Sequence, residues 1–365
     1  AGALGAATGF GLRLHGGAGR GGDINTKKAY KCYFRGLYGD ARLVYPIIPD
    51  TEVVEFDKLV LRSGFNDAFR TNGAAAYIRD QLIRELQQDM GAIISHGSWF
   101  NLFVNMRFRG LYNVVERMDE EFLESYTRSD AWDVIKTGND VLAGENVEWE
   151  RLHTFARDRD LSQDALFDEA AAMVDLENFT SYMILNTWAQ NQDWPHNNWY
   201  AARRQGPEGR WIFLSWDAEF GIGLIPGGFS ADSFQFTLNQ GGYIRDVFAA
   251  FLRNAAYQEY FAGELDRHLF QALRPAGVLA KIDKLRARIA PDIPEEAQLT
   301  GNTLTQWANN ISTCRAFAQN RGSVYRNLVF ASAAHDFPQP PRVFACDPPQ
   351  VVNTGGVVVR ARGAR

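Results

Sequence analysis

Polar side chains between residues 191 and 221 have the types and the spacing that phosphoryl transfer uses. Asp193 is followed five positions later by Asn198, and Asp217 and Glu219 come after the apolar run WIFLSW. When a phosphoryl group leaves a metal–nucleotide complex, one carboxylate orients the attacking hydroxyl group, while an amide and a second carboxylate hold metal against the phosphates. The pattern makes Asp193 the candidate catalytic residue, and Asn198, Asp217 and Glu219 the candidate metal ligands.

The loop that carries Asp193 and Asn198 could have a purely structural role, because Asp and Asn often form Asx turns. The residues between them include Trp194 and Pro195, and Trp199 follows directly. Such bulky residues indicate a packed loop, which is what holding a carboxylate in a fixed position requires. We therefore favour the functional interpretation of this loop.

Asp217 and Glu219 lie two positions apart. In an extended segment both side chains would point to one face, about 6–7 Å from each other. Carboxylates that close raise each other's pKa unless a cation lies between them, and a divalent metal prefers oxygen ligands. A solvated strand end and the carboxylate pair of a glycoside hydrolase remain open as alternatives.

Candidates for phosphate binding lie earlier in the chain. The turn HGGAGRGGDI contains Gly17, Gly19 and Gly22 in a G-x-G-x-x-G pattern between two expected strands. A glycine-rich hairpin lets backbone N–H groups approach phosphates closely. A plain flexible turn is an equally good interpretation of the same glycines.

Charged residues near the expected strands could complete such a site. Lys28, Lys31 and Lys136 are alternative phosphate-binding lysines, and Arg62, in LRSGFND, could neutralise phosphate charge. Glu116 is a candidate to pair with the lysine that binds phosphate. For each of them a solvated surface position is the competing interpretation. The sequence contains no G-x-S-x-G, H-E-x-x-H or G-x-x-x-x-G-K-[ST] motif that would indicate another chemistry.

Composition limits the classes of function. The 365 residues carry a net charge of −5 and 46% hydrophobic residues, so the chain is globular and no nucleic-acid partner is expected. No apolar run approaches the roughly 18 residues of a membrane helix.

The three cysteines show no metal-binding spacing and allow at most one disulfide, whose pairing stays open; they are Cys32, Cys314 and Cys346. Because the chain starts without Met, we expect a processed product or a part of a longer polypeptide.

Hydrophobic periodicity predicts an α+β protein of two lobes, β-rich over residues 1–160 and helical over 161–335, followed by an extended Pro- and Gly-containing tail at 336–365. Strands are expected at 10–15, 29–34, 56–61, 99–106, 111–115, 199–204 and 210–216, with a turn at Arg109–Gly110 between the fourth and fifth. Helices are expected at 74–90, 162–174 (capped by Ser162), 176–190 (capped by Asp175), 243–261, 275–289 and 304–332. A ligand cleft would lie between the lobes.

Several sequence blocks together resemble the CotH-type spore-coat kinases, an atypical protein kinase family. They are LRLHGGAGR, KKAYKCYFRGLYG, FDKLVLRSGFND, FRGLYNVVERMDEEF, VDLENFTSYMILNTWAQNQDWPHNNWYAAR and FLSWDAEFG, within residues 10–330. The resemblance implies a reduced, kinase-like two-lobe fold that binds ATP with Mg²⁺ or Mn²⁺ and phosphorylates Ser or Thr of a protein. It also implies an extracytoplasmic place, in a spore coat, on a cell surface or among secreted proteins.

The resemblance carries over to individual positions. Asp193 matches the acid of the family's catalytic loop, and Asp217 matches the acid that binds metal. Glu219 departs from the pattern, because family members often have a second Asp there. Glu116 matches the acid of an E-R block, and Lys136 matches a lysine that often follows that block.

Two other functions remain open on the sequence alone. A catalytically inactive, kinase-like adhesion module would keep the fold but bind neither nucleotide nor metal. A glycoside hydrolase would use Asp217 and Glu219 and would act without nucleotide.

Overall fold

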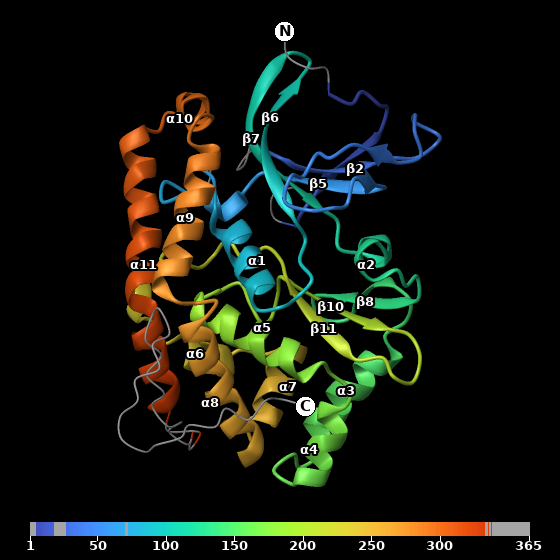
Figure 1. Cartoon of the computed structure of the whole chain (residues 1–365), viewed down its shortest axis with the longest axis vertical. Helices are drawn as coiled ribbons and strands as arrows, with labels where there is room; N and C mark the ends of the chain where they lie inside the picture. Colours follow the sequence, from blue (N-terminus) through green and yellow to red (C-terminus); the bar gives the residue numbers. More distant parts are fainter. Residues whose placement is uncertain (1–4, 18–26, 70–71, 333–334, 336, 338–365) are drawn as a thin grey trace, which may run out of the picture.

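The structure is a computed structural model that describes residues 5–17, 27–69, 72–332, 335 and 337. Gly19, Gly22, Cys346 and the tail predicted at 336–365, apart from Phe337, lie outside the described residues. The chain forms mixed α+β structure, with β-sheets mainly in its N-terminal half and mainly helices in its C-terminal part (Figure 1). The predicted fold class is confirmed at this level.

The larger sheet is antiparallel and has the strand order β1-β2-β5-β7-β6. Its strands are β1 (Gly11–His15), β2 (Ala29–Tyr33), β5 (Lys58–Arg62), β6 (Gly97–Val104) and β7 (Arg107–Glu116). A two-stranded ribbon of β3 (Leu43–Val44) and β4 (Glu55–Phe56) is inserted between β2 and β5.

The register of this sheet places cationic side chains on one face. Arg13 pairs with Lys31, which in turn pairs with Val60, and Val60 pairs with Val115. Because alternate residues of a strand share a face, Arg62 lies on the same face as Lys31, and Glu116 points to the opposite face.

A hairpin turn in this sheet differs from the prediction. β6 and β7 pair as expected, but the turn is at Asn105 and Met106, with φ of 51° and 62°, and not at Arg109–Gly110. Two-residue hairpin turns favour positive φ at both positions, which suits Asn and Gly but not Met. Met106, 96% exposed at the tip, therefore gave no turn signal.

The smaller sheet has the order β11-β10-β8-β9. Its strands are β8 (Trp132–Lys136), β9 (Asp140–Ala143), β10 (Trp199–Arg204) and β11 (Trp211–Ser215). The predicted hairpin of β10 and β11 is confirmed. A buried apolar cluster that includes Val60 and Val115 of the larger sheet and Val134, Tyr200 and Trp216 from β8, β10 and the end of β11 packs the two sheets together.

Most predicted helices are present, with local changes of boundary. They are α1 (Arg79–Asp89), α4 (Asp164–Ala171), α5 (Leu176–Trp188), α9 (Pro275–Ile289) and α11 (Leu304–Phe330). The helix predicted at 243–261 is two helices, α7 (Tyr243–Phe251) and α8 (Ala255–Phe270). The break occurs at Asn254, whose side chain caps α8 by accepting a hydrogen bond from the Tyr257 N–H at 3.0 Å.

Caps explain the other differences. Asp175 caps α5 as predicted, at 3.0 Å from the Asn178 nitrogen, whereas α4 begins after Gln163 and Ser162 does not cap it. α1 begins at Arg79, later than predicted, because Asp67 accepts the backbone N–H groups of Ala76 and Arg79 at 2.6 and 2.9 Å. The sequence pattern did not indicate the remaining helices, α2 (Glu120–Thr127), α3 (Val147–Asp158), α6 (Ser233–Leu238) and α10 (Ile293–Thr300).

Helix α10 is joined to strand β7 of the larger sheet through one buried carboxylate, that of Glu296. Glu296 accepts hydrogen bonds from the Leu111 N–H at 2.7 Å, the Lys27 ammonium at 2.8 Å and the Tyr77 hydroxyl at 2.8 Å. Neither the Lys27 nor the Glu296 side chain is more than 1% exposed. The helical part and the sheet are therefore held in one arrangement.

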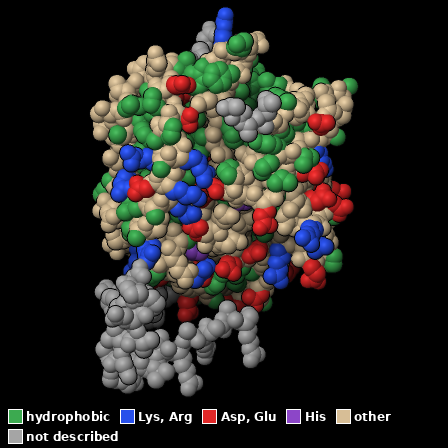
Figure 2. All heavy atoms as spheres, turned by 45° about the horizontal axis from the view of Figure 1, so that its top comes forward, with side chains coloured by type: hydrophobic (Ala, Val, Ile, Leu, Met, Phe, Trp, Pro, Cys, Tyr) green, Lys and Arg blue, Asp and Glu red, His purple; other side chains and the backbone are tan. Residues whose placement is uncertain are grey.

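Charged side chains of both signs are interspersed on the face shown in Figure 2. Apolar side chains gather toward its upper part. The β6–β7 hairpin, at the top of Figure 1, exposes Phe103 and Met106.

Candidate active site

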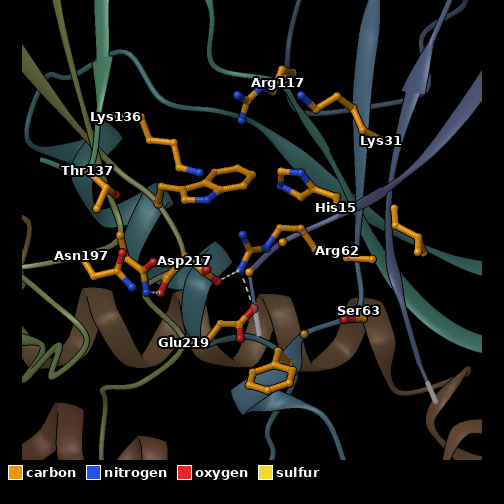
Figure 3. Close-up of a pocket in the computed structure, with 18 of the residues that line it drawn as sticks. His15, Lys31, Arg62, Ser63, Arg117, Lys136, Thr137, Asn197, Asp217 and Glu219 are labelled. Atoms are coloured by element: carbon orange, nitrogen blue, oxygen red, sulfur yellow. Dashed lines mark hydrogen bonds and ion pairs between the residues drawn. The ribbon is translucent and has the colours of Figure 1, made fainter. Parts of the chain in front are cut away.

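A cavity of about 580 Å³ is lined by residues of both sheets and of the loops beside them (Figure 3). Candidates from the sequence analysis that line it are Gly17, Lys31, Arg62, Lys136, Asp193, Asn198, Asp217 and Glu219. Lys28 and Glu116 do not line it. The chain therefore brings most of the predicted residues together from segments far apart in sequence.

The Asp193 loop follows α5 and is held by its own side chains. Asn198 donates a hydrogen bond from Nδ2 to Asp193 Oδ2 at 2.6 Å and approaches the Asp217 carbonyl oxygen at 3.4 Å. Trp194 is fully buried and donates to the Tyr182 hydroxyl at 2.8 Å. The Asp193 side chain remains 36% exposed, which leaves it open to a second reactant.

The second acidic segment begins where β11 ends. Asp217 has a φ of 57°, and Asn198 has the same value, although neither is glycine. Left-handed backbone is uncommon for residues other than glycine, and Asn and Asp are the side chains that adopt it most readily. The Arg62 guanidinium contacts Asp217 Oδ1 at 2.6 Å and also bonds Glu219 Oε1, so one cation joins both carboxylates.

Asp217 and Glu219 differ strongly in exposure. The Asp217 side chain is 40% exposed, whereas that of Glu219 is 3% exposed and accepts the Asn66 N–H at 2.9 Å. Burial raises the pKa of Glu219 to about 8, against the opposing effect of Arg62, and the charges of Asp217 and Asp80 add to the rise. Glu219 thus lies at the closed end of the cavity, and Asp217 faces its open part.

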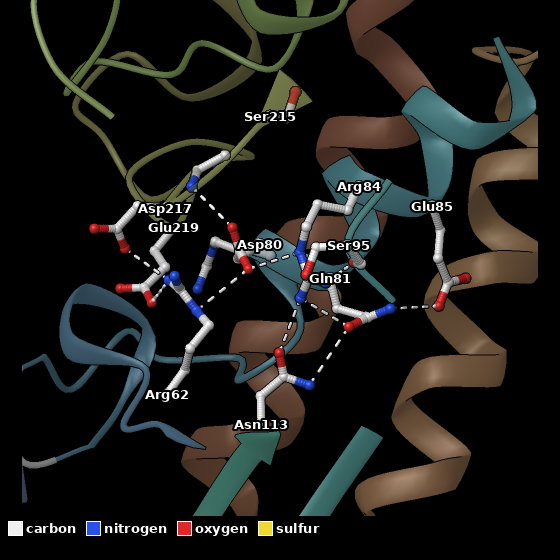
Figure 4. Close-up of polar contacts among 12 residues, drawn as sticks. Arg62, Asp80, Gln81, Arg84, Glu85, Ser95, Asn113, Ser215, Asp217 and Glu219 are labelled. Atoms are coloured by element: carbon white, nitrogen blue, oxygen red, sulfur yellow. Dashed lines mark hydrogen bonds and ion pairs between the residues drawn. The ribbon is translucent and has the colours of Figure 1, made fainter. Parts of the chain in front are cut away.

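Asp80, in the first turn of α1, connects this segment to the helix (Figure 4). Its Oδ1 accepts the Ala218 N–H at 3.0 Å, and its Oδ2 lies 3.0 Å from Arg84 Nε and 3.4 Å from Arg62 Nε. Burial would raise the pKa of Asp80, but the two arginines outweigh it and hold that pKa below its usual value. Sequence reasoning missed Asp80, because an acidic residue in a first helical turn is ordinary.

The donor set at the acidic end fits a divalent metal ion. Asp193, Asn198, Asp217 and Glu219 offer carboxylate and amide oxygens, which Mg²⁺ and Mn²⁺ prefer. Arg62 shows that a cation can be accommodated between Asp217 and Glu219.

A different group of carboxylates, Asp57, Asp119 and Glu121, has ligand atoms that lie within 4.8 Å of one another, close enough to share a metal ion. The Lys58 ammonium already contacts all three, at 2.7, 3.0 and 2.9 Å. Burial raises the pKa of Asp119 to about 6, with Lys58 opposing the rise. None of the three carboxylates lines the cavity.

The other end of the cavity is cationic. Arg13, Lys31, Arg117 and Lys136 line it around His15. Burial, together with the charges of Arg117, Lys31, Arg62 and Lys136, lowers the pKa of His15 to about 3, so the imidazole is neutral. Burial and Arg117 lower the pKa of Lys31 to about 8.

Arg117 and His15 were not singled out from the sequence. The available signal was the alternation that starts at Val115 and puts Arg117 on the face of Lys31 and Arg62, once the sheet order is known. His15 belongs to a strand that was predicted, but the register of β1 against β2 was not predictable.

The remaining predicted residues have other surroundings. Glu116 accepts hydrogen bonds from the His96 N–H at 2.8 Å and from the Tyr126 hydroxyl at 2.8 Å, on the face away from the cavity. The Lys28 carbonyl oxygen accepts the Tyr112 hydroxyl at 2.8 Å. Cys32 and Cys314 are buried free thiols.

Oxygen ligands for a metal at one end of a cavity, and cations for phosphates at the other, are the features that a kinase site needs. The sequence model described as CotH kinase protein matches residues 19–325. Because this match covers most of the chain, the protein belongs to the CotH kinase family and is an atypical protein kinase. Membership implies protein kinase activity and the use of ATP.

No curated protein matches the chain. Among the helices of the described residues, none has the length and apolarity needed to cross a membrane.

Proposed function

We propose that the protein transfers the γ-phosphoryl group of ATP, complexed with Mg²⁺ or Mn²⁺, to Ser or Thr of a protein substrate. The observation that supports this proposal most is that Asp193, Asn198, Asp217 and Glu219 converge in one cavity with Arg62. Asp193 orients the acceptor hydroxyl and accepts its proton. Asn198, Asp217 and Glu219 hold the metal, which neutralises phosphate charge when bound.

Arg62 and Asp80 fit the ion pair that positions phosphates in protein kinases. In those enzymes a lysine on the third strand pairs with a glutamate of the next helix. Here Arg62 ends β5, the third strand of the larger sheet, and Asp80 lies in α1, the helix that follows. On this basis we propose a kinase-like fold, in which Asp80 keeps Arg62 in place while Asp217 and Glu219 ligate metal.

Two observations weigh against the alternatives left open by the sequence. Asp217 and Glu219 both contact the same guanidinium nitrogen of Arg62, so they do not flank an open space in which a sugar ring could lie between them. The full set of candidate groups in one cavity disfavours an inactive adhesion module.

The location of the protein is a separate proposal. We propose an extracytoplasmic place, in a coat, on a surface or in a secretion, supported by the family alone. Fractionation of source cells with an antibody would test it, and recovery of the protein only in the cytoplasm would contradict it.

The direct test of the enzymatic proposal is transfer of γ-labelled phosphate to casein-like acceptors in the presence of Mn²⁺ or Mg²⁺. The wild type, Asp217→Asn and Asp168→Asn are compared; Asp168 is an exposed residue of α4 and serves as a matched control. We expect label with the wild type and the control, none with Asp217→Asn, and none in EDTA. Phosphoserine and phosphothreonine in the product would identify the acceptor. Equal transfer by Asp217→Asn would refute the proposed metal site.

A further inference from the structure

A second cavity, of about 760 Å³, is lined by the β10–β11 turn, the start of α3 and the end of α4 (Figure 1). Among the described residues, none lines both this cavity and the candidate active site. Four carboxylates and two arginines line it together with apolar side chains. We call this second cavity the acidic groove.

Hydrogen bonds hold the walls of the acidic groove in place. Asp133 of β8 accepts the Glu145 N–H at 3.0 Å and Gln205 Nε2 at 3.0 Å. The Trp211 N–H donates to the Met173 carbonyl oxygen at 3.0 Å, which joins β11 to the segment that follows α4. The elements around the groove are therefore fixed relative to one another, and the groove is preformed.

The charges of the acidic groove are unbalanced toward the negative side. Arg203 lies 3.3 Å from Asp133, and the exposed Arg151 contacts a carboxylate three residues earlier in α3 at 3.2 Å. Glu145 and Glu169 are exposed, and neither has a Lys, Arg or His within ion-pair distance in the part of the chain that the structure describes. Both cations of the lining are thus paired, whereas these two carboxylates remain available to a cationic ligand.

Apolar side chains lie beside these carboxylates. Val147, the first residue of α3, is 61% exposed, and Pro207 of the β10–β11 turn is also exposed. Trp211 is 1% exposed, and its indole N–H has no hydrogen-bond partner among the described residues. Because buried donors normally have a partner, the carbonyl oxygens of a peptide main chain would suit this lining. Apolar contacts and unpaired carboxylates together match a peptide segment with both cationic and apolar side chains.

The two strands of one hairpin connect the acidic groove to the candidate active site. β10 begins directly after Asn198, and β11 ends shortly before Asp217, whereas the turn that joins the two strands lines the groove. At about 3.3 Å per residue, the length of β10 places the two sites roughly 20 Å apart. An extended peptide covers this distance with at least about six residues.

We propose that the acidic groove docks a basic segment of the protein substrate, one that also carries apolar side chains and lies at least about six residues from the phosphorylated Ser or Thr. This proposal rests on the proposed kinase function, because a protein acceptor is long enough to occupy both sites at once. Docking raises the concentration of the acceptor at the active site, so it lowers KM and leaves kcat unchanged.

The first measurement is fluorescence anisotropy with a labelled peptide of alternating Arg and Leu residues, at about 50 mM salt, where screening is weak. The double variant Glu145→Gln/Glu169→Gln is compared with the wild type and with the control Asp168→Asn/Glu208→Gln, which removes the same charge from exposed residues outside the groove lining. We expect about 10-fold weaker binding by the groove variant and at most about 2-fold weaker binding by the control. Because all four residues are exposed, each variant should fold.

The second measurement is label transfer to two casein-like acceptors, one of which carries the Arg–Leu segment on a linker of about ten residues. For the acceptor with the segment, Glu145→Gln/Glu169→Gln should raise KM by about 10-fold and leave kcat unchanged. For the acceptor without the segment, the wild type and both double variants should have the same KM.

Equal binding of the Arg–Leu peptide by both double variants, or an equal KM for the acceptor that carries the segment, would overturn the docking site. If the equal KM came with normal label transfer, the kinase proposal would stand. Groove-dependent peptide binding by a protein that transfers no label would instead reject the kinase proposal and, with it, the assignment to a protein substrate.

A basic segment of the chain itself is the competing occupant, since Arg360, Arg362 and Arg365 lie close together in sequence. The triple variant Arg360→Gln/Arg362→Gln/Arg365→Gln tests it with the same labelled peptide. Unchanged peptide binding supports the assignment to the substrate. Binding at least about 10-fold tighter than that of the wild type would assign the groove to the chain's own arginines and overturn that assignment.

Discussion

Asp80 should stabilise the protein and its active site together, and Asp80→Asn isolates this contribution. The variant keeps an oxygen that can accept the Ala218 N–H, so the backbone contact survives. It removes the negative charge beside Arg62 and Arg84, which are 6% and 0% exposed. Breaking a buried ion pair typically costs about 3–5 kcal/mol of unfolding free energy.

The other partners of Arg62 and Arg84 reduce the expected loss of unfolding free energy. Arg62 keeps Asp217 and Glu219, and Arg84 keeps Gln81 Oε1 at 2.8 Å and Asn113 Oδ1 at 2.9 Å. We therefore expect a loss of about 2–4 kcal/mol in the free energy of unfolding. Binding of metal–ATP should also weaken, because Arg62 and the Asp217 segment lose their common partner.

Urea unfolding of the wild type, Asp80→Asn and Asp89→Asn measures the effect. Asp89 is at the other end of α1 and forms a part-exposed pair with Lys281 at 3.2 Å, so its variant should lose at most about 1 kcal/mol. If Asp80→Asn were as stable as Asp89→Asn, the arginines would not depend on Asp80, and the reasoning would be refuted.

Three more predictions follow from the site and its support. Asp193→Asn should lower kcat about 10²- to 10⁴-fold and leave the affinity for metal–ATP unchanged, as measured by initial rates and calorimetry; a parallel loss of affinity would contradict its role as acceptor base. Lys31 has a pKa of about 8, below the roughly 10.4 of a free lysine, under the effects of burial, Arg117, Lys58 and Lys136 against that of Asp119. Since only its protonated form attracts phosphate, ADP affinity in EDTA should fall by up to about 10-fold per pH unit above pH 8. Lys31→Arg should abolish this fall, and an unchanged pH profile would exclude Lys31 from phosphate binding. Glu296→Gln should cost about 3 kcal/mol in urea unfolding, because it removes a buried negative charge that contacts the Lys27 ammonium and the Leu111 N–H, and a loss below about 1 kcal/mol would contradict this prediction.

Local patterns predicted the parts of the fold that depend on short stretches of sequence. The strand pairs, the Asp175 cap and the start of α9 at Pro275 each rest on residues that are neighbours in the chain. The errors in the predicted helix and turn boundaries occur where a residue distant in sequence, or an unusual residue type, determines the local structure. Asp67 delays the start of α1 through its side chain, and a turn with Met106 in place of glycine carries no recognisable signal.

The residues of the candidate site divide in the same way, into those that a local pattern indicates and those whose role depends on contacts distant in sequence. The spacing of Asp193, Asn198 and Asp217 was sufficient to propose a metal and its chemistry, and the structure places these residues together. Asp80 and Arg117 act through contacts with residues far away in sequence, so no local pattern could single them out. Glu116 was favoured by a family pattern, but strand alternation turns it to the opposite face.

The Glu296 contact has a consequence for how the chain reaches its native state. Lys27 and Glu296 are separated by 269 positions, and the same carboxylate also holds Leu111 of β7. During synthesis all strands of the larger sheet are therefore made long before Glu296, which contacts Lys27 and Leu111, has emerged from the ribosome. Long-range contacts of this kind slow folding, and unfinished sheets expose apolar surface and unpaired edges. Fragments that end before α10 should consequently depend on chaperones or aggregate, even though they contain every candidate catalytic residue.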